Sequence, residues 1–137
     1  MSAEARGSAR GIIVTHARMG EALIEAAEEI SGITGALAAV SNRGATPRAL
    51  QEEVASAVGD GPAIVFVDLA AGSCGFAGRA AIRTCGVATV VTGVSLPMLL
   101  EFLFHRDLPL PELSERLVEK GRAGITRVGQ RSGGDGA

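Results

Sequence analysis

The chain has 137 residues, of which 47% are hydrophobic, 20% charged and 3% aromatic, and its formal net charge is −2. This length suits one domain, and the composition can fill a hydrophobic core, which excludes a disordered chain. A slightly acidic chain without Trp or Tyr lacks both the basic surface and the aromatic platform that nucleic-acid-binding proteins use, so we expect no nucleic-acid partner.

The ends of the chain and its apolar stretches give expectations about domain bounds and location. Residues 1–10 and 131–137 are rich in small and polar residues, which predicts a flexible N-terminus and a flexible tail around one domain at 11–130. No export signal is visible, and the longest apolar stretch, around 87–100, is interrupted by polar residues and by Pro97. We therefore expect a cytoplasmic protein that is not embedded in a membrane.

Short apolar runs alternate with segments of helical spacing in the first half of the chain. Residues 11–15, 37–41 and 63–67 predict strands, and the last of these is a continuous apolar run typical of a strand buried on both faces. Residues 21–30 place their apolar side chains on one face of a helix. Thr46 and Pro47 open a second helix, which ends at Gly59.

The same alternation continues in the second half. Helices are predicted at 75–84, 96–104 and 111–120, a fourth strand at 87–91, and a candidate last strand at 125–128. Crossover connections of this length imply parallel strands. We therefore predict an α/β fold of three layers, with a mostly parallel sheet of four strands and helices on both of its faces.

Two reactive side chains directly follow predicted strands: His16 follows the first and Asp68 the third. These strands are commonly neighbours in a doubly wound sheet, which binds ligands beyond the carboxyl ends of its strands. A carboxylate on one imidazole nitrogen fixes the tautomer that leaves the other nitrogen free to attack. Gly72 and Ser73, near the next helix start, could offer N–H groups and a hydroxyl to phosphate oxygens. Phosphoryl transfer depends mostly on positioning and charge stabilisation, so His16 and Asp68, with Gly72 and Ser73 as phosphoryl-binding residues, could suffice for it.

Each of these residues also has a purely structural interpretation. His16 can be a loop or capping residue, Asp68 the N-cap of the following helix, and Gly72-Ser73 an ordinary turn. The other histidine, His105, ends an apolar helix and suits an interaction with the helix dipole. Cys74 suits a buried and inert thiol.

The cysteines and glycines indicate no metal or cofactor. Cys74 and Cys85 form neither a CxxC pair nor part of a Cys/His cluster in the sequence. We expect free thiols in a reducing compartment and no metal site. The phosphate-binding patterns GxGxxG and GxxxxGK[ST] are absent, so we also expect no organic cofactor.

Three segments resemble the IIA component of the mannose-family phosphotransferase system (PTS). They are IIVTHARMGEALIEAAEEISG at 12–32, VFVDLAAGSCGFAGRAA at 65–81, and VVTGVSLPMLLEFLFHRD at 90–107. They occur in the family's order and, with the α/β pattern that connects them, they span nearly the whole domain. The string GV-x-x-PML-x-E in the third segment is the most specific part of the resemblance.

The resemblance implies that His16 is the phosphorylated histidine, Asp68 the carboxylate that hydrogen-bonds to it, and Ser73 a hydroxyl near the phosphoryl group. It implies a phosphohistidine carrier that accepts its phosphoryl group from the phosphocarrier HPr, which enzyme I charges from phosphoenolpyruvate. The carrier would pass the group to a IIB partner, in sugar transport or in regulation. A homodimer is also implied, in which a C-terminal strand, here 125–128, crosses to the other subunit.

The sequence departs from the family pattern after Asp68. Family members often have a tryptophan and paired glycines there, with a proline after the serine, whereas this chain reads LAAGSC at 69–74.

Three other functions remain open. A phosphohistidine subunit of a dihydroxyacetone kinase has the same fold and a similar histidine site. A receiver domain phosphorylated on Asp68 would need an acidic cluster after the first strand, where this chain has Thr15 to Ala17. The last is a non-catalytic ligand or interaction module.

Overall fold

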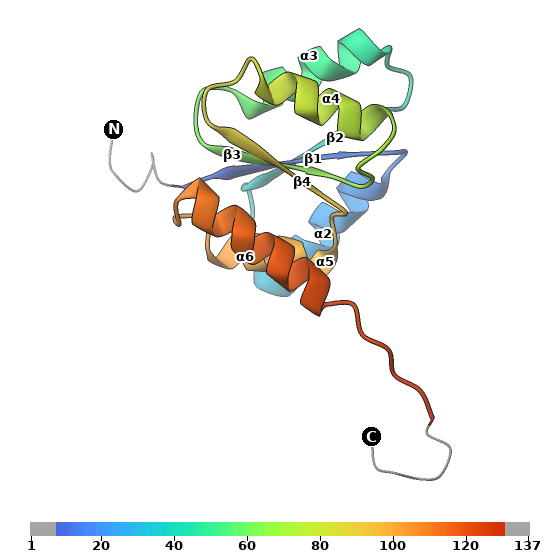
Figure 1. Cartoon of the computed structure of the whole chain (residues 1–137), viewed down its shortest axis with the longest axis vertical. Coiled ribbons are helices and arrows are strands. Elements are labelled where there is room, and N and C mark those ends of the chain that lie inside the picture. Colours follow the sequence, from blue (N-terminus) through green and yellow to red (C-terminus); the bar gives the residue numbers. More distant parts are fainter. Residues whose placement is uncertain (1–7, 131–137) are drawn as a thin grey trace.

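The computed structural model describes residues 8–130, which form four strands and five helices (Figure 1). In chain order these are β1 (Arg10–Thr15), α2 (Met19–Ser31), β2 (Leu37–Ser41), α3 (Pro47–Val58), β3 (Ala63–Val67), α4 (Ser73–Ile82), β4 (Ala88–Thr92), α5 (Leu96–Phe104) and α6 (Leu110–Ala123). The β2, β3 and α5 segments match the predicted ranges residue for residue.

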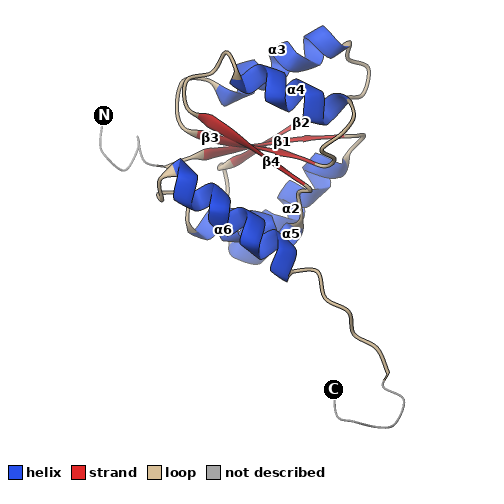
Figure 2. Ribbon diagram, viewed as in Figure 1, coloured by secondary structure: helices blue, strands red, loops and turns tan. Residues whose placement is uncertain are grey.

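The four strands form one sheet in the order β2-β1-β3-β4, and every neighbouring pair is parallel. Helices α3 and α4 cover one face of the sheet, and α2, α5 and α6 cover the other (Figures 1 and 2). The predicted three-layer α/β fold is confirmed, including the adjacency of the first and third strands.

Each face of the sheet has its own buried core, because successive side chains of a strand point to opposite faces. Ile13 and Phe66 pack toward α2, α5 and α6, whereas Ile12 and Val65 pack toward α3 and α4. All five residues of β3 are buried, as the continuous apolar run predicted. The two central strands are thus covered on both faces, and this rigid centre carries the loops at their ends.

Local capping explains where two of the helices begin. The hydroxyl of Thr46 accepts the N–H of Ala49 at the start of α3, and the hydroxyl of Ser95 accepts the N–H of Met98 at the start of α5. Helix α4 differs, because its N-cap is Gly72 and no side chain caps it. It also begins at Ser73, two residues before the predicted start, so Ser73 lies in its first turn.

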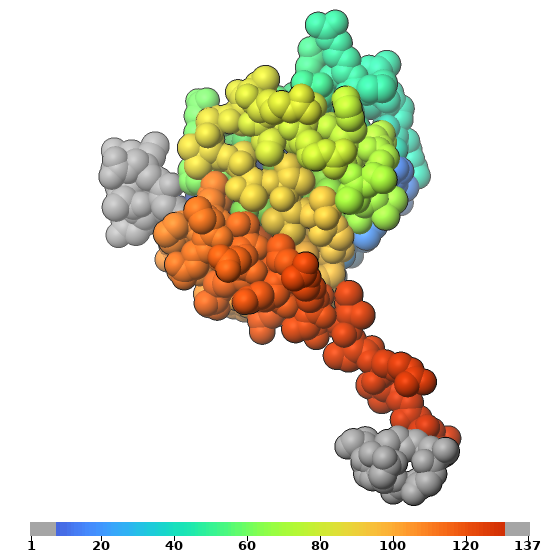
Figure 3. All heavy atoms as spheres, viewed as in Figure 1, coloured from blue at the N-terminus to red at the C-terminus, as the bar shows by residue number. Residues whose placement is uncertain are grey.

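The prediction of a last strand at 125–128 is wrong for the single chain. After α6 ends, residues 125–130 have no regular secondary structure and extend away from the body (Figure 3). Ile125 and Val128 are 83% and 92% exposed. A β-branched run forms a strand only where a neighbouring strand accepts its backbone hydrogen bonds, and none lies beside this segment within residues 8–130.

The N-terminal boundary also differs from the predicted one. Arg10 begins β1, and Ala9 is fully buried and exchanges two hydrogen bonds with Arg106. Residues 9 and 10 therefore belong to the folded body, although a flexible N-terminus was predicted to include them. Residues 1–7 and 131–137 of the predicted flexible ends lie outside the described residues. Across 8–130, no helix combines the length and the apolar character that crossing a membrane requires.

Candidate functional site

The carboxyl ends of the four parallel strands meet at one edge of the sheet, here called the carboxyl edge. His16 directly follows β1 and Asp68 directly follows β3, and these strands are hydrogen-bonded neighbours. Val14 pairs with Val67 in the register of the two strands. Both reactive residues therefore leave the sheet at nearly the same level, which is the juxtaposition that the sequence predicted.

Asp68 contacts His16 at two points through a single oxygen. Its Oδ2 atom accepts the backbone N–H of His16 at 2.9 Å and lies 2.8 Å from Nδ1 of the imidazole ring. The other oxygen, Oδ1, accepts the N–H of Leu69 at 2.9 Å. Because Nδ1 faces a carboxylate, this nitrogen carries the proton of the neutral ring, and Nε2 retains its lone pair.

The surroundings keep Asp68 ionised at neutral pH. Burial by itself would raise the pKa of this carboxyl, since its side chain is only 8% exposed. The hydrogen bonds from the backbone N–H of His16, from its ring and from the N–H of Leu69 outweigh burial, and the pKa is lowered from its ordinary value of 3.8. The His16 side chain is 44% exposed, so a carboxylate at the base of the site holds an accessible ring.

The turn after His16 is held by the end of the neighbouring strand β2. Ala17 has a φ of +52°, a left-handed conformation that is uncommon for a residue with a Cβ atom. Its carbonyl accepts the hydroxyl of Ser41 at 2.8 Å, and its N–H donates to Oδ1 of Asn42 at 3.4 Å. These contacts fix the backbone on which the imidazole is mounted.

The first turn of α2 is tied to the end of β1. The buried hydroxyl of Thr15 accepts the N–H of Gly20 at 2.8 Å. A Cβ atom on Gly20 would lie 3.0 Å from that hydroxyl oxygen, so glycine allows the close approach. Helix α2 is thereby anchored directly behind His16.

The start of α4 lies beside the histidine. Gly72, the N-cap, has a φ of +95°, which favours glycine, and Ser73 is the first helical residue. The first N–H groups of a helix have no partner within the helix, and here no side chain caps them. The Ser73 hydroxyl accepts an N–H of the Asn42 side-chain amide (Nδ2) at 3.5 Å. This bond links the residue after β2 to the first turn of α4.

Close packing fixes the loop between β3 and α4. A Cβ atom on Gly75 would meet the carbonyl oxygen of Ala70 at 2.3 Å, so only glycine fits there. The guanidinium of Arg79 donates to the same carbonyl at 2.7 Å. This loop connects Asp68 to Ser73 and is therefore held from two sides.

Cys74 lies inside the site, contrary to the interpretation that it belongs to no Cys/His cluster. Its Sγ atom is 3.7 Å from Nδ1 of His16, and the residue is fully buried, as predicted. Burial, and then the negative charge of Asp68, raise the pKa of the thiol, while a hydrogen bond with Ser73 opposes them in part. The thiol is therefore protonated at neutral pH.

The fold brings the four predicted site residues, His16, Asp68, Gly72 and Ser73, to the carboxyl edge. His105 lies at the C-terminal end of α5, as predicted, and its Nε2 atom is 3.4 Å from a carboxylate oxygen of Glu101. Asn42 was not predicted as a site residue, although it directly follows β2. His16 and Asp68 were selected because they follow parallel strands, and the same rule applies to Asn42.

This arrangement is suited to nucleophilic attack by Nε2 on an anionic group. The contact of Asp68 with Nδ1 can orient the ring, and its carboxylate can stabilise the positive charge that would develop if Nε2 formed a bond. The uncapped end of α4 offers N–H groups and the positive end of a helix dipole to an anion. A neutral nucleophile beside an uncapped helix N-terminus is compatible with phosphoryl transfer, which depends mainly on positioning and charge stabilisation.

Comparisons with known proteins give the chain a family and a fold. The family model EIIA-man, described as PTS system fructose IIA component, matches residues 11–117. No curated protein sequence gives a significant match. Among solved structures, the mannose/sorbose-specific IIA subunit of the phosphotransferase system from Enterococcus faecalis is similar, with a TM-score of 0.80 and 22% identity over 91% of this chain and 98% of that chain.

Two further structures have the same fold. Phosphotransferase system component EIIA from Streptococcus agalactiae has a TM-score of 0.74 and 20% identity, over 86% of this chain and 95% of that chain. The PTS IIA protein associated with the fucose utilization operon of Streptococcus pneumoniae has a TM-score of 0.74 and 18% identity, over 88% of this chain and 93% of that chain.

Proposed function

This chain belongs to the family of PTS fructose IIA components, and we propose that it is a phosphohistidine carrier that holds a phosphoryl group on Nε2 of His16. The observation that carries the proposal is the 2.8 Å contact between Nδ1 of His16 and Oδ2 of Asp68. This contact assigns the ring proton to Nδ1 and the nucleophilic lone pair to Nε2.

The proposed step is a direct transfer between two proteins. The lone pair of Nε2 forms a bond to the phosphorus of a phosphorylated donor, and the bond between that phosphorus and the donor breaks, returning its electron pair to the donor. The imidazole of His16 keeps the proton on Nδ1 and gains positive charge. Asp68 is ionised and within hydrogen-bonding distance, so it stabilises the phosphorylated ring.

The transferred group needs partners for its oxygens, and we assign this role to Gly72 and Ser73. The N–H groups that open α4 have no side-chain cap, and the Ser73 hydroxyl belongs to the same turn. Asn42 contacts both that hydroxyl and the turn after His16. It therefore couples the nucleophile to the anion-binding turn and holds the two in register.

The proposed partners follow from the family. We propose HPr as the donor and a IIB component as the acceptor, with the carrier acting in the cytoplasm, in sugar transport or in regulation. The His16 ring is 44% exposed on the carboxyl edge. Such exposure suits a group that two partner proteins must reach in turn.

Labelling tests this function. The full chain is incubated with enzyme I, HPr and labelled phosphoenolpyruvate, and the expected product is an acid-labile phosphate on the wild type and none on His16→Ala. The matched control is His105→Ala, which should be labelled like the wild type. An unlabelled wild type with a competent donor would contradict the proposal. Transfer from the labelled chain to a IIB protein, and not to a dihydroxyacetone kinase subunit, is expected to identify the acceptor.

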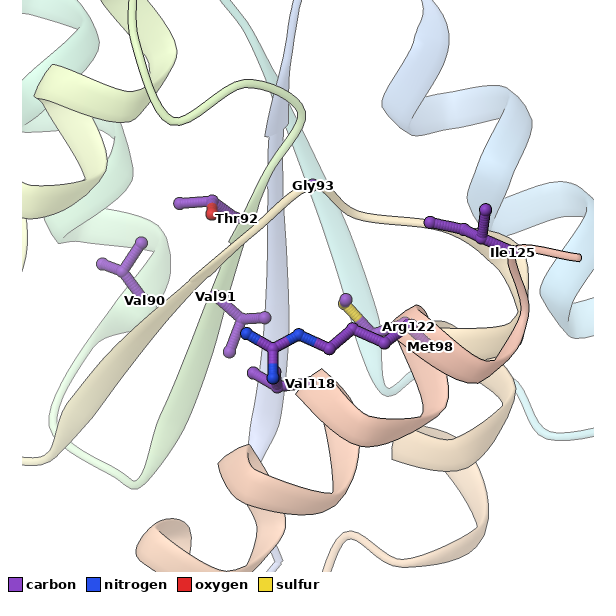
Figure 4. Close-up of a pocket in the computed structure, with 9 residues that line it drawn as sticks. Val90, Val91, Thr92, Gly93, Met98, Val118, Arg122 and Ile125 are labelled. Carbon is purple, nitrogen blue, oxygen red and sulfur yellow. The ribbon is translucent and has the colours of Figure 1, made fainter.

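We also propose a homodimer in which residues 125–128 pair with the partner subunit. β4 is an edge strand, and a hollow of about 450 Å³ lies between β4 and α6 (Figure 4). Val90, Val118 and Ile125 are among the residues that line it. An exposed edge strand beside an apolar hollow can accept another strand.

Sedimentation tests the dimer. The double variant Ile125→Ser/Val128→Ser is expected to sediment as a monomer while the wild type sediments as a dimer. Both side chains are exposed in the single chain, so the change leaves the subunit fold intact. The control Ile30→Ser alters an exposed residue of α2 and should remain dimeric. A monomeric wild type at micromolar concentration would exclude this assembly.

A further inference from the structure

We propose that His16, Asp68 and Cys74 together bind a thiophilic divalent cation, with Zn²⁺ as the preferred ion, and that metal binding and phosphoryl acceptance exclude each other. The metal site rests on the geometry of the three side chains alone. The claim that bound metal prevents phosphoryl acceptance rests in addition on the proposed function of His16.

The three side chains bring three different metal-binding atoms to one point. Nδ1 of His16 lies 2.8 Å from Oδ2 of Asp68 and 3.7 Å from Sγ of Cys74, and all three ligand atoms lie within 4.8 Å of one another. Zinc bonds of about 2.0–2.3 Å at tetrahedral angles place ligand atoms about 3.3–3.6 Å apart. A zinc ion would therefore require Nδ1 and Oδ2 to move about 0.5 Å apart. It would also require Sγ of Cys74 and Oδ2 of Asp68, which lie within 4.8 Å of each other, to come to a similar spacing.

The chemical types of the ligands select the ion. A thiolate, an imidazole and a carboxylate together favour Zn²⁺ and disfavour Mg²⁺ or Ca²⁺, which prefer sets of oxygen ligands. Asp68 can serve because a carboxylate has lone pairs beyond those used by the N–H groups of His16 and Leu69. The thiol of Cys74 loses its proton when it binds the metal, so binding releases one proton to solvent.

Metal binding would change the tautomer of His16. In the metal-free site Nδ1 carries the proton and Nε2 the reactive lone pair. A metal ion on Nδ1 uses the lone pair of that nitrogen, so the single proton of the neutral ring must sit on Nε2. Nε2 then has no free lone pair and cannot act as the nucleophile, and Asp68, bound to the metal, no longer accepts the proton of Nδ1. One ion on Nδ1, the ring nitrogen that does not receive the phosphoryl group, would thus inactivate the carrier.

The position of the cluster supports a site that a free ion can reach. Cys74 is fully buried and the Asp68 side chain is 8% exposed, whereas the side chain of His16, which contacts both, is 44% exposed. Rotation of the His16 side chain would open a path for an ion from solvent. A water molecule can then complete the tetrahedron. The second free cysteine, Cys85, makes its sulfur contact with the carbonyl of Ala55 and takes no part in the cluster.

Cobalt binding provides the first test. The reduced full chain, freed of metal with a chelator, is titrated with Co²⁺ and followed by the thiolate-to-cobalt absorption band, and Zn²⁺ is then added as a competitor. We expect one equivalent to bind, the band to be absent in Cys74→Ser, and Zn²⁺ affinity to fall at least tenfold in that variant. Cys85→Ser is the matched control and should bind like the wild type. No band in the wild type, or an unchanged affinity in Cys74→Ser, would overturn the proposal.

Nitrogen-15 NMR of the histidine ring tests the tautomer without any substitution. The expected change on adding Zn²⁺ is a proton that moves from Nδ1 to Nε2 of His16, and a ring that keeps its proton on Nδ1 would contradict the site. In the labelling assay, Zn²⁺ should suppress phosphorylation of the wild type at least tenfold more than that of Cys74→Ser. If His16 is labelled but no metal binds, the metal-site proposal is wrong and the carrier function stands. If metal binds but His16 is not labelled, the metal site stands, and the carrier function and the mutual exclusion of metal and phosphoryl group are wrong.

Discussion

Nδ1 of His16 and Oδ2 of Asp68 lie 2.8 Å apart, although 52 residues separate them in the sequence. The parallel pairing of β1 with β3 produces this contact, because each residue directly follows one of these strands. Asp68 in turn is fixed by the N–H groups of His16 and Leu69. The orientation of the ring is therefore built into the two central strands of the sheet.

Asp68→Asn should slow phosphoryl acceptance by about 100-fold or more, because an amide does not enforce the proton on Nδ1 or stabilise the charged ring. The variant should still fold, since asparagine has the same shape. The measurement is the initial rate of labelling from phosphorylated HPr, with Asp60→Asn, an exposed aspartate, as the control. A rate within threefold of the wild type would show that Asp68 only supports the loop.

The stability of the chain should depend on the ionisation of Asp68. Its pKa is lowered in the folded state from 3.8, so its contribution to folding is present above the unfolded pKa and is lost as the pH falls through the folded pKa. Urea unfolding of the wild type and Asp68→Asn should show the wild type to be more stable at pH 7. The difference should shrink below about pH 4. Equal stabilities at pH 7 would contradict this assignment, and Asp60→Asn should show no such pH-dependent difference.

Gly75→Ala should destabilise the chain by about 1–3 kcal/mol, because the added Cβ atom overlaps the backbone. The atom would lie 2.3 Å from the carbonyl oxygen of Ala70, which cannot move without shifting the loop from Asp68 to Ser73. The rate of labelling should fall as well. Gly86→Ala is the control, since its Cβ would enter open space. Thermal unfolding and labelling together test this packing, and an unperturbed Gly75→Ala would refute it.

Glu101→Gln should destabilise the chain by about 1–2 kcal/mol without changing the rate of labelling. The Glu101 carboxylate is 8% exposed, and its Oε2 atom accepts the Nε–H of Arg116 at 3.0 Å. Nη2 of Arg116 lies 2.9 Å from the same oxygen, and this ion pair joins α5 to α6. The control Glu52→Gln breaks a pair with Arg48 on the exposed face of α3 and should change stability by less than about 0.5 kcal/mol. A loss of labelling in a folded Glu101→Gln would indicate a role in function that the structure does not explain.

Most of the fold could be predicted because its signals are local. The apolar run at 63–67 gave a buried strand, and Thr46 with Pro47 gave the start of α3. The prediction of a strand at 125–128 was wrong for the single chain because it rested on composition alone. A strand also needs a neighbouring strand to accept its hydrogen bonds, and composition does not show whether one is present. The start of α4 was predicted two residues late, because a glycine N-cap offers no polar side chain to mark it.

The centre of the site was also predictable, and its surroundings less so. His16 and Asp68 follow neighbouring parallel strands, and the rule for ligand sites in such sheets selects them. The contact of Cys74 with His16 spans 58 residues and depends on where α4 begins, which no sequence pattern fixed. Asn42 was overlooked because its role comes from contacts with Ala17 and Ser73, both distant in sequence.

The position of the phosphoryl group on the His16 ring is the most direct test of the central claim. The wild type, labelled with nitrogen-15 in its histidines, is phosphorylated through enzyme I and HPr and examined by phosphorus and nitrogen NMR. We predict a bond between phosphorus and Nε2 of His16, with the proton kept on Nδ1, where it faces Asp68. Phosphate on Nδ1, on His105, or on Asp68 as a hydroxylamine-sensitive acyl phosphate would contradict it.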